Sequence, residues 1–463
     1  MPSPQSPRGV EEALSVPGSV TEAGARGSAA GIGGDMLRGD PAVIEVTAAD
    51  RLYGSAATAA FGLLWVAARA AGVSADALRC RSGRLPDAQG PVLWFHGASA
   101  GEMRAAGALA TVLGQCGYRF TTAYTATNRA GIELAAHAGG ADAIVALAPW
   151  DHPRWVARAL DHWQPLGLFL VETELWPSLI LAARRRNVPV FCVSARIFPR
   201  DFARYRLIRS LTAPMLRRVT AVLAQNETER DRLVALGADP ERCTVAGNLK
   251  YVATGATCTS DSSWRHELGL RSDEPVIVFG SIHSDEVGAI FTALERLPMA
   301  TLRAVIAPRH GSTVAAIVRE ARRRSWRVHQ RTAGVPAPDW QILVLDRMGE
   351  LAAAYAMASV GVVGGGFGKH GGHNPLEPVM VGTPVMFGEH FDHFEHEALA
   401  LSAVTPEARV AGATQLGQRL SEWLSAATDR RRIVELQRRC LPDGAAITKR
   451  YVAALSPWLG GCA

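Results

Sequence analysis

The strongest constraint on the fold of this chain is an alternation, beginning near residue 90, between short apolar runs and segments with helical periodicity. The runs are rich in β-branched and aromatic residues and are short enough to be buried strands. This alternation is typical of a parallel sheet whose two faces are covered by helices. In the first half of the chain the predicted strands are VLWFH (92–96), RFTTAY (119–124), AIVAL (143–147), LGLFLV (166–171), VPVFCV (188–193) and VTAVLA (219–224).

The pattern lapses over the small and polar residues 251–264, which we interpret as a linker, and then restarts. With 463 residues the chain is also long for a single core. We therefore predict two doubly wound, Rossmann-like α/β domains that face a central cleft, over residues 76–250 and 265–463, the second ending in helices. The predicted strands of the second domain are PVIVFG (275–280), LRAVIAP (302–308), QILVLD (341–346), ASVGVVGG (358–365) and TPVMFG (383–388).

The N-terminal segments have a different character. Residues 1–48 are rich in Gly, Pro, Ser and Ala, and we predict a disordered extension. Residues 49–75 contain an uncharged stretch from Leu52 to Ala68, but small residues dilute it and it is short for a bilayer-spanning helix. An interfacial, membrane-associated helix is the favoured interpretation, with a packed soluble helix and a true span as alternatives.

Charge and cysteine content narrow the function classes. The net charge is +6, which suits acidic substrates or an anionic membrane surface, whereas no nucleic-acid-binding motif is present. The seven cysteines form no C-x-x-C pair, so neither a disulfide framework nor a zinc site is indicated.

Acidic residues follow two of the predicted strands in the first domain. Glu102 comes after the small residues GASAG that follow the first strand, and Glu172 and Glu174 come after the fourth. Because the carboxyl ends of parallel strands meet at one edge of a sheet, these acids are expected to face one cleft. Two carboxylates there suit a general base and an orienting partner, although an acid in a first helical turn also serves simply as a cap.

Two further patterns allow alternatives. GFGKHG (366–371) matches the dinucleotide-binding motif G-x-G-x-x-G, so an NAD-dependent oxidoreductase is an alternative function. However, prolines follow soon after the motif and break the long helix that such a site requires. We favour a nucleotide-phosphate loop followed by a short helix that carries Glu377. The stretch EHFDHFEHE spaces His390, His393 and His396 three apart; a metal site is the alternative to a solvated helix start, and we predict no metal.

Ten motifs at these strand ends, in this order, resemble the 3-deoxy-D-manno-octulosonate (Kdo) transferases of lipopolysaccharide assembly. The motifs are ASAGE, VETELWPSLI, SARIF, AQNETERDRLVALGA, VAGNLKY, GSIHSDE, APRH, DRMGELAAAY, GGHNPLEP and GEHFDHF. The resemblance implies an inverting, metal-independent glycosyltransferase of the GT-B architecture without a cofactor. It implies transfer of Kdo from CMP-Kdo to a lipid A precursor (lipid IVA) at the cytoplasmic face of the inner membrane.

The resemblance also implies roles for individual residues. Glu102 corresponds to the catalytic base, and Glu174 to a second acidic residue of the same cleft. The residues implied for the donor side are Ser281, His283, Arg309, His310, Met348, Gly349, Glu350, Gly372, Asn374 and Glu377. The implied partners are CMP-Kdo, the lipid A precursor and the inner-membrane surface, with no nucleic acid.

The chain departs from the family pattern at several positions of these motifs, including Ser178, Ser194, Val252, Ile282 and His393. These departures leave the acceptor and the number of Kdo units open. Two alternatives therefore stand beside Kdo transfer: another GT-B nucleotide-sugar transferase or epimerase, and a catalytically silent membrane-associated paralogue.

Overall fold

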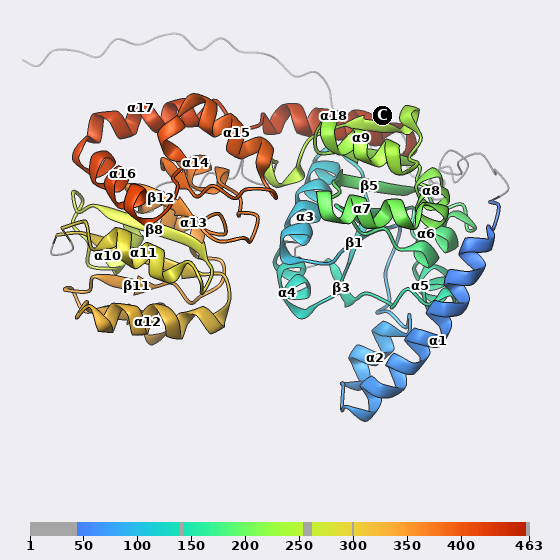
Figure 1. Cartoon of the computed structure of the whole chain (residues 1–463). Coiled ribbons are helices and arrows are strands. Elements are labelled where there is room, and N and C mark those ends of the chain that lie inside the picture. The colour runs from blue at the N-terminus through green and yellow to red at the C-terminus, as the bar shows by residue number, and fades with distance from the viewer. Residues whose placement is uncertain (1–43, 139–141, 253–261, 299–300, 460–463) are drawn as a thin grey trace, which may run out of the picture.

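The computed structural model describes residues 44–138, 142–252, 262–298 and 301–459. Most of the predicted N-terminal extension and of the predicted linker lies outside these ranges. The described chain forms two lobes, each built around one sheet (Figure 1). The predicted domain boundaries themselves stay a prediction.

The first lobe contains a seven-stranded sheet of order β3-β2-β1-β4-β5-β6-β7, in which all neighbouring strands are parallel. β1, β4 and β5 are buried along their whole length, which explains why they read as continuous apolar runs rather than as alternating patterns. The strands are β1 (Val92–Gly97), β2 (Thr121–Ala126), β3 (Ile144–Leu147), β4 (Gly167–Val171), β5 (Val190–Ala195), β6 (Ala221–Ala224) and β7 (Cys243–Val245).

Helices cover both faces of this sheet. The helices of the first lobe are α1 (Ala48–Ala70), α2 (Ala75–Arg81), α3 (Ala100–Gln115), α4 (Arg129–Ala138), α5 (Pro153–Trp163), α6 (Pro177–Arg184), α7 (Pro199–Leu207), α8 (Arg209–Arg217) and α9 (Glu227–Leu236). Proline at the first position of α5, α6 and α7 starts these helices where its missing N–H costs nothing.

The second lobe contains a six-stranded parallel sheet of order β10-β11-β9-β8-β12-β13. Its strands are β8 (Val276–Ile282), β9 (Arg303–Pro308), β10 (Val328–Gln330), β11 (Ile342–Val344), β12 (Val360–Val363) and β13 (Val385–Phe387). The helices in this part of the chain are α10 (Ser262–Glu267), α11 (Val287–Leu294), α12 (Val314–Arg323), α13 (Leu351–Met357), α14 (Leu376–Met380), α15 (Glu395–Val404), α16 (Ala413–Ser425), α17 (Ala427–Arg438) and α18 (Gly444–Leu459). The prediction of two doubly wound parallel sheets is thus confirmed.

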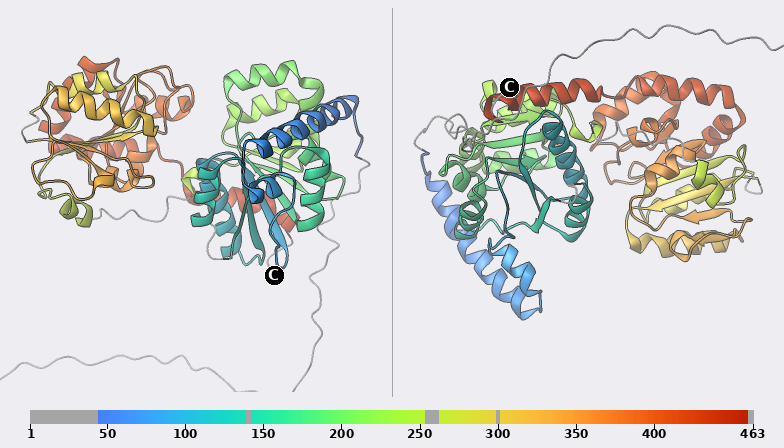
Figure 2. Two further views of the ribbon diagram at one scale, coloured as in Figure 1. Left: turned by 90° about the horizontal axis from the view of Figure 1, so that it is seen from below. Right: turned by 180° about the vertical axis from the view of Figure 1, so that it is seen from behind.

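The last helix returns to the first lobe. α18 runs from the second lobe across to the first, as Figure 1 and the right-hand view of Figure 2 show. Its buried Tyr451 hydroxyl accepts a hydrogen bond from the Ser194 N–H at 2.8 Å and donates one to the Gly247 carbonyl at 2.9 Å. One apolar core consequently runs from the α3 face of the first sheet through α18 into the second lobe.

The N-terminal helix α1 is held at one end and exposed at the other. A buried ion pair between Asp50 and Arg218 of 2.6 Å ties its first turn to the end of α8. Further along the helix, Leu63 and Val66 are 73% and 61% exposed. Within the described ranges, no helix has both the length and the apolar character needed to cross a bilayer.

Candidate active site

Glu102 lies in the first turn of α3, directly after the end of β1. Its Oε2 accepts a hydrogen bond from the Ala98 N–H at 2.6 Å, and its Oε1 accepts one from the Ser99 hydroxyl at 2.7 Å. The small residues before it are needed for this approach: a Cβ on Gly97 would lie 3.0 Å from the Glu102 Cβ and 2.5 Å from the Met103 Cε. The sharp turn from strand to helix therefore depends on glycine.

Three carboxylates gather at this edge of the sheet. Burial and the charges of Glu172 and Glu174, both on the loop after β4, raise the pKa of Glu102 to about 7. A carboxyl group with a pKa near neutrality is suited to exchange a proton with a substrate.

The two acids after β4 have different partners. Glu172 is buried, in a left-handed conformation with φ of 58°, and its carboxylate is 2.5 Å from the Lys250 ammonium. Glu174 instead accepts a hydrogen bond from the Trp176 indole at 2.8 Å and lies 3.5 Å from His96 Nε2. Lys250 was not predicted as a site residue, although it stands in the quoted motif VAGNLKY, because nothing in that motif indicates a partner 78 residues away.

In the second lobe, Glu286 organises two loops. Its buried carboxylate accepts hydrogen bonds from the N–H groups of His283, Gly365, Phe367 and Gly368. It thereby joins the end of β8 to the glycine-rich loop after β12, and it too was missed as a site residue. The approach is close, since a Cβ on Gly364 would lie 2.7 Å from the carbonyl oxygen of Ser281.

Several residues predicted for the donor side meet here. His283 Nε2 is 2.8 Å from His373 Nε2, and the His283 ring lies 5.7 Å from that of His310. Burial, together with the charge of Arg309 and the neighbouring histidines, lowers the pKa of His373 to about 3. Gly372, buried with φ of 73°, and Asn374, whose side chain accepts from the Leu376 N–H, shape the turn into α14.

Glu377 of α14 relates this cluster to the first lobe. Burial raises its pKa, and the positive charges of Arg104, Lys250 and Arg309 act in the opposite direction. Arg104 and Lys250 belong to the first lobe and Arg309 to the second. Cationic side chains of both lobes therefore act electrostatically on this carboxylate.

A further predicted group, Met348, Gly349 and Glu350, has separate contacts. Glu350 is paired with Arg331 at 3.0 Å, and Met348 is 89% exposed. Among the residues that the structure describes, no hydrogen bond or ion pair joins these three to Arg309 or Glu377. The polar contacts of this group are therefore to Arg331, and its place in the donor site stays a prediction.

The lobes also meet at Arg196, which follows β5. Its guanidinium donates to the His393 carbonyl at 2.8 Å and lies 4.0 Å from the centre of the Phe198 ring. His390 and His393 precede α15, so the three-residue spacing of these histidines does not lie on one helix. In the part of the chain that the structure describes, no group of three or more His, Cys, Asp or Glu side chains is arranged to hold a metal ion.

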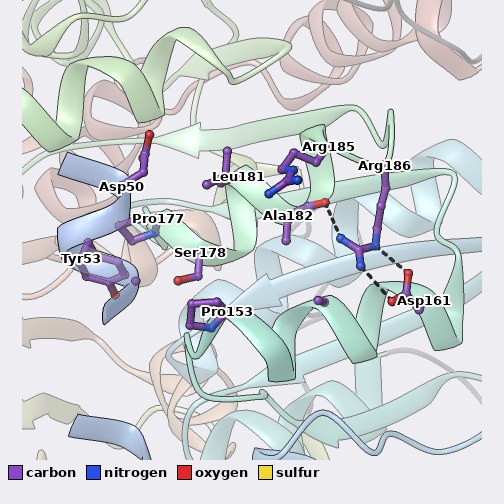
Figure 3. Close-up of a pocket in the computed structure, with 12 residues that line it drawn as sticks. Asp50, Tyr53, Pro153, Asp161, Pro177, Ser178, Leu181, Ala182, Arg185 and Arg186 are labelled. Atoms are coloured by element: carbon purple, nitrogen blue, oxygen red, sulfur yellow. Dashed lines mark hydrogen bonds and ion pairs between the residues drawn. The ribbon is translucent and has the colours of Figure 1, made fainter. Parts of the chain in front are cut away.

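A separate groove of about 640 Å³ runs between α1, α5 and α6 (Figure 3). Tyr53, Pro153 and Pro177 lie toward one end, and Arg186, bound to Asp161 at 2.7 Å, lies at the other. None of the predicted site residues lines it.

The comparisons with known proteins agree with the architecture and with the motifs. Residues 76–253 match the family model of 3-deoxy-D-manno-octulosonic-acid transferase (kdotransferase). The chain is 32% identical over 419 residues to the 3-deoxy-D-manno-octulosonic acid transferase of Bordetella pertussis, covering 86% of this chain and 95% of that relative. It is 28% identical over 384 residues to the enzyme of that name from Haemophilus influenzae, covering 81% and 88%.

Solved structures support the fold alone, since their identities are low. A glycosyltransferase from Rickettsia africae has a TM-score of 0.55 at 12% identity, covering 81% of this chain and all of that one. The UDP-GlcNAc 2-epimerase of Neisseria meningitidis has a TM-score of 0.56 at 12% identity, covering 79% and 99%. The two parallel sheets are therefore those of a GT-B protein, and with its extended similarity to the Bordetella enzyme the chain belongs to the Kdo transferase family and is a glycosyltransferase.

Proposed function

We propose that this enzyme transfers Kdo from CMP-Kdo to a lipid A precursor, lipid IVA, with inversion at the anomeric carbon. The observation that carries the proposal is the Glu102 carboxylate, whose pKa is raised to about 7 and which lies at the edge where cationic groups of both lobes gather. A buried carboxylate with a pKa raised in this way is typical of a group used for proton transfer.

The reaction follows from these groups. The ionised Glu102 accepts the proton of an acceptor hydroxyl, and the oxygen so released forms a bond to the anomeric carbon of Kdo. The bond from that carbon to the phosphate oxygen breaks at the same time, and CMP leaves with the electron pair. In-line attack inverts the configuration, and the positive charge of Arg309 offsets the charge on the departing phosphate.

The remaining predicted residues have supporting roles in this proposal. Glu174 orients the acceptor beside Glu102. Ser281, His283, His310, Gly372, Asn374 and Glu377 bind the donor. The loop of Met348, Gly349 and Glu350 belongs to the same set.

We also place the enzyme on the cytoplasmic face of the inner membrane. The exposed Leu63 and Val66 of α1 support this location, as does the basic surplus of the chain. Both proposed substrates are anionic, which the same surplus suits.

The test is transfer from CMP-Kdo, generated in situ, to a tetraacylated lipid A precursor. We expect product from the intact enzyme and none from Glu102→Gln, while CMP still binds to both. The matched control is Glu435→Gln, which changes an exposed acid of α17 in the same way and should leave transfer intact.

Two results would contradict the proposal. If the intact enzyme neither forms product nor binds CMP, the donor is wrong. If it instead binds or converts UDP-GlcNAc, the epimerase alternative is favoured.

A further inference from the structure

The imidazole of His96 presents an unusual buried polar atom. The side chain is fully buried on β1, yet its Nε2 makes no hydrogen bond within the described structure. A buried polar atom in this state costs free energy and is rare in native proteins. The Oε2 atom of Glu174 lies 3.5 Å from it.

The other ring nitrogen is fixed by two neighbours. His96 Nδ1 is 2.9 Å from the hydroxyl of Thr125, its register partner on β2, and that hydroxyl also accepts a hydrogen bond from the Trp94 indole at 2.8 Å. Trp94 reaches it because residues two apart on a strand share a face and because the register partner of Trp94 is the small Ala123.

This arrangement selects one tautomer of His96. An indole N–H can only donate, so the Thr125 oxygen is an acceptor toward Trp94. Within the described residues, the Thr125 hydroxyl proton has no acceptor other than His96 Nδ1. The imidazole proton therefore sits on Nε2 and points toward Glu174.

Glu174 is held on one side only. Its Oε2 faces both the Trp176 indole, at 2.8 Å, and His96 Nε2, and the His96 ring lies edge-on to Trp176 with 4.3 Å between ring centres. Its Oε1 has no hydrogen-bond partner among the described residues, and the side chain is 15% exposed. One oxygen is thus directed at the protein while the other is available to a ligand.

We propose that His96 is a positioning residue for transfer, whose Nε2–H closes onto Glu174 when the acceptor sugar binds and holds the free Glu174 oxygen toward the sugar beside Glu102. Hydrogen bonds in unliganded active sites are often long and shorten in the substrate complex. This inference rests on the proposed function, and it assigns the pair Thr125 and Trp94 the task of keeping the His96 proton on Nε2.

The main test compares His96→Gln with His96→Asn. The Gln amide nitrogen reaches the place of Nε2 and can still donate to Glu174, whereas the shorter Asn reaches only the place of Nδ1. We expect His96→Asn to lower kcat by about 10- to 100-fold, because misplacement of a group by about 1 Å costs rates of this order. The KM for CMP-Kdo should stay unchanged, and His96→Gln should retain most of the activity.

The matched control is His152→Asn. His152 is also buried and accepts a hydrogen bond from the Arg154 N–H at the start of α5, a capping role that Asn performs well. Its transfer rate should equal that of the intact enzyme. If His96→Gln and His96→Asn lose activity equally, or if neither loses any, His96 is a structural residue and the inference is wrong.

A second measurement does not depend on activity. In ¹⁵N-histidine-labelled enzyme, the resonance that His96→Gln removes should show the proton on Nε2, and Thr125→Val should abolish that preference while Thr125→Ser keeps it. A proton on Nδ1 in the intact enzyme overturns the inference even if transfer proceeds as proposed. Conversely, an enzyme with the expected tautomer but no transfer from CMP-Kdo contradicts the proposed function instead.

Discussion

At the scale of single residues, the raised pKa of Glu102 predicts how activity depends on pH. Only the ionised carboxylate can accept the acceptor proton, and its pKa is about 7. The kcat/KM should therefore rise with pH through about 7 and level off above it. The check is a pH–rate profile of the intact enzyme, and a profile that is flat across this range would contradict the assignment of Glu102.

The same shift predicts an effect on stability. Because the pKa of Glu102 lies above its ordinary value of 4.5, the folded state binds more protons than the unfolded state between 4.5 and about 7. The contribution of Glu102 to stability is greatest below 4.5 and is lost as the pH rises through 7. Glu102→Gln does not titrate, so its stability relative to the intact enzyme should increase with pH, by at most about 3 kcal/mol. Urea unfolding at acidic and alkaline pH measures this, with Glu435→Gln as the control that shows no such trend.

Gly97 supplies a steric prediction. In Gly97→Ala the new methyl group would lie 3.0 Å from the Glu102 Cβ and must displace that side chain, so kcat should fall by about 10- to 100-fold. Gly101→Ala is the matched variant, since its methyl group would lie 3.5 Å from the Lys250 Cε, an ordinary contact. An equal loss in both variants would show that the effect does not act through Glu102.

At the scale of elements, a buried ion pair helps to attach α1, beside the hydrogen bond from Tyr53 to Asp151 and the stacking of Phe61 on Trp150. The Arg218 guanidinium binds both carboxylate oxygens of Asp50, at 2.8 and 2.6 Å, and both side chains are buried. Arg218→Met leaves the Asp50 charge buried without its partner, which should cost about 3 kcal/mol. Denaturant unfolding measures the loss, and faster proteolysis within α1 shows where it occurs.

The control for this prediction is Arg230→Met. Arg230 pairs with Asp231 on the surface of α9, where solvent screens the charges, so little change is expected. If Arg218→Met and Arg230→Met have the same free energy of unfolding, the ion pair does not hold α1.

At the scale of the whole molecule, α18 joins the two lobes through Tyr451. Tyr451→Phe removes the acceptor of the buried Ser194 N–H, and the unpaired group should cost about 1–3 kcal/mol. The measurement is the free energy of unfolding in urea. Tyr205→Phe is the control, because the Tyr205 hydroxyl makes no hydrogen bond within the described structure. Equal stability of Tyr451→Phe and the intact enzyme would contradict this account of how α18 joins the two lobes.

Much of the architecture was predictable because buried parallel strands leave a local signal. Each long strand reads as an apolar run, and both sheets follow from it. The strands that were missed, β7 and β10, have three residues each and lie at the edges of their sheets. β11 and β13 are equally short but are buried throughout and lie in apolar runs, whereas β7 and β10 are only partly buried and show no such run.

The sequence by itself determined the two-sheet fold, the family and the placement of Glu102 and Glu174 at strand ends, because each depends on the local order of residues. Only the tertiary structure decided which partner each of the two acids after β4 has. Glu172 is bound by Lys250, 78 residues further along the chain, and Glu174, on the loop after β4, faces His96 of the neighbouring strand β1. The course of α18 was likewise decided by packing, since Tyr451 bonds to a residue 257 positions away. Such contacts depend on how distant segments of the chain pack in space, and no local pattern encodes them.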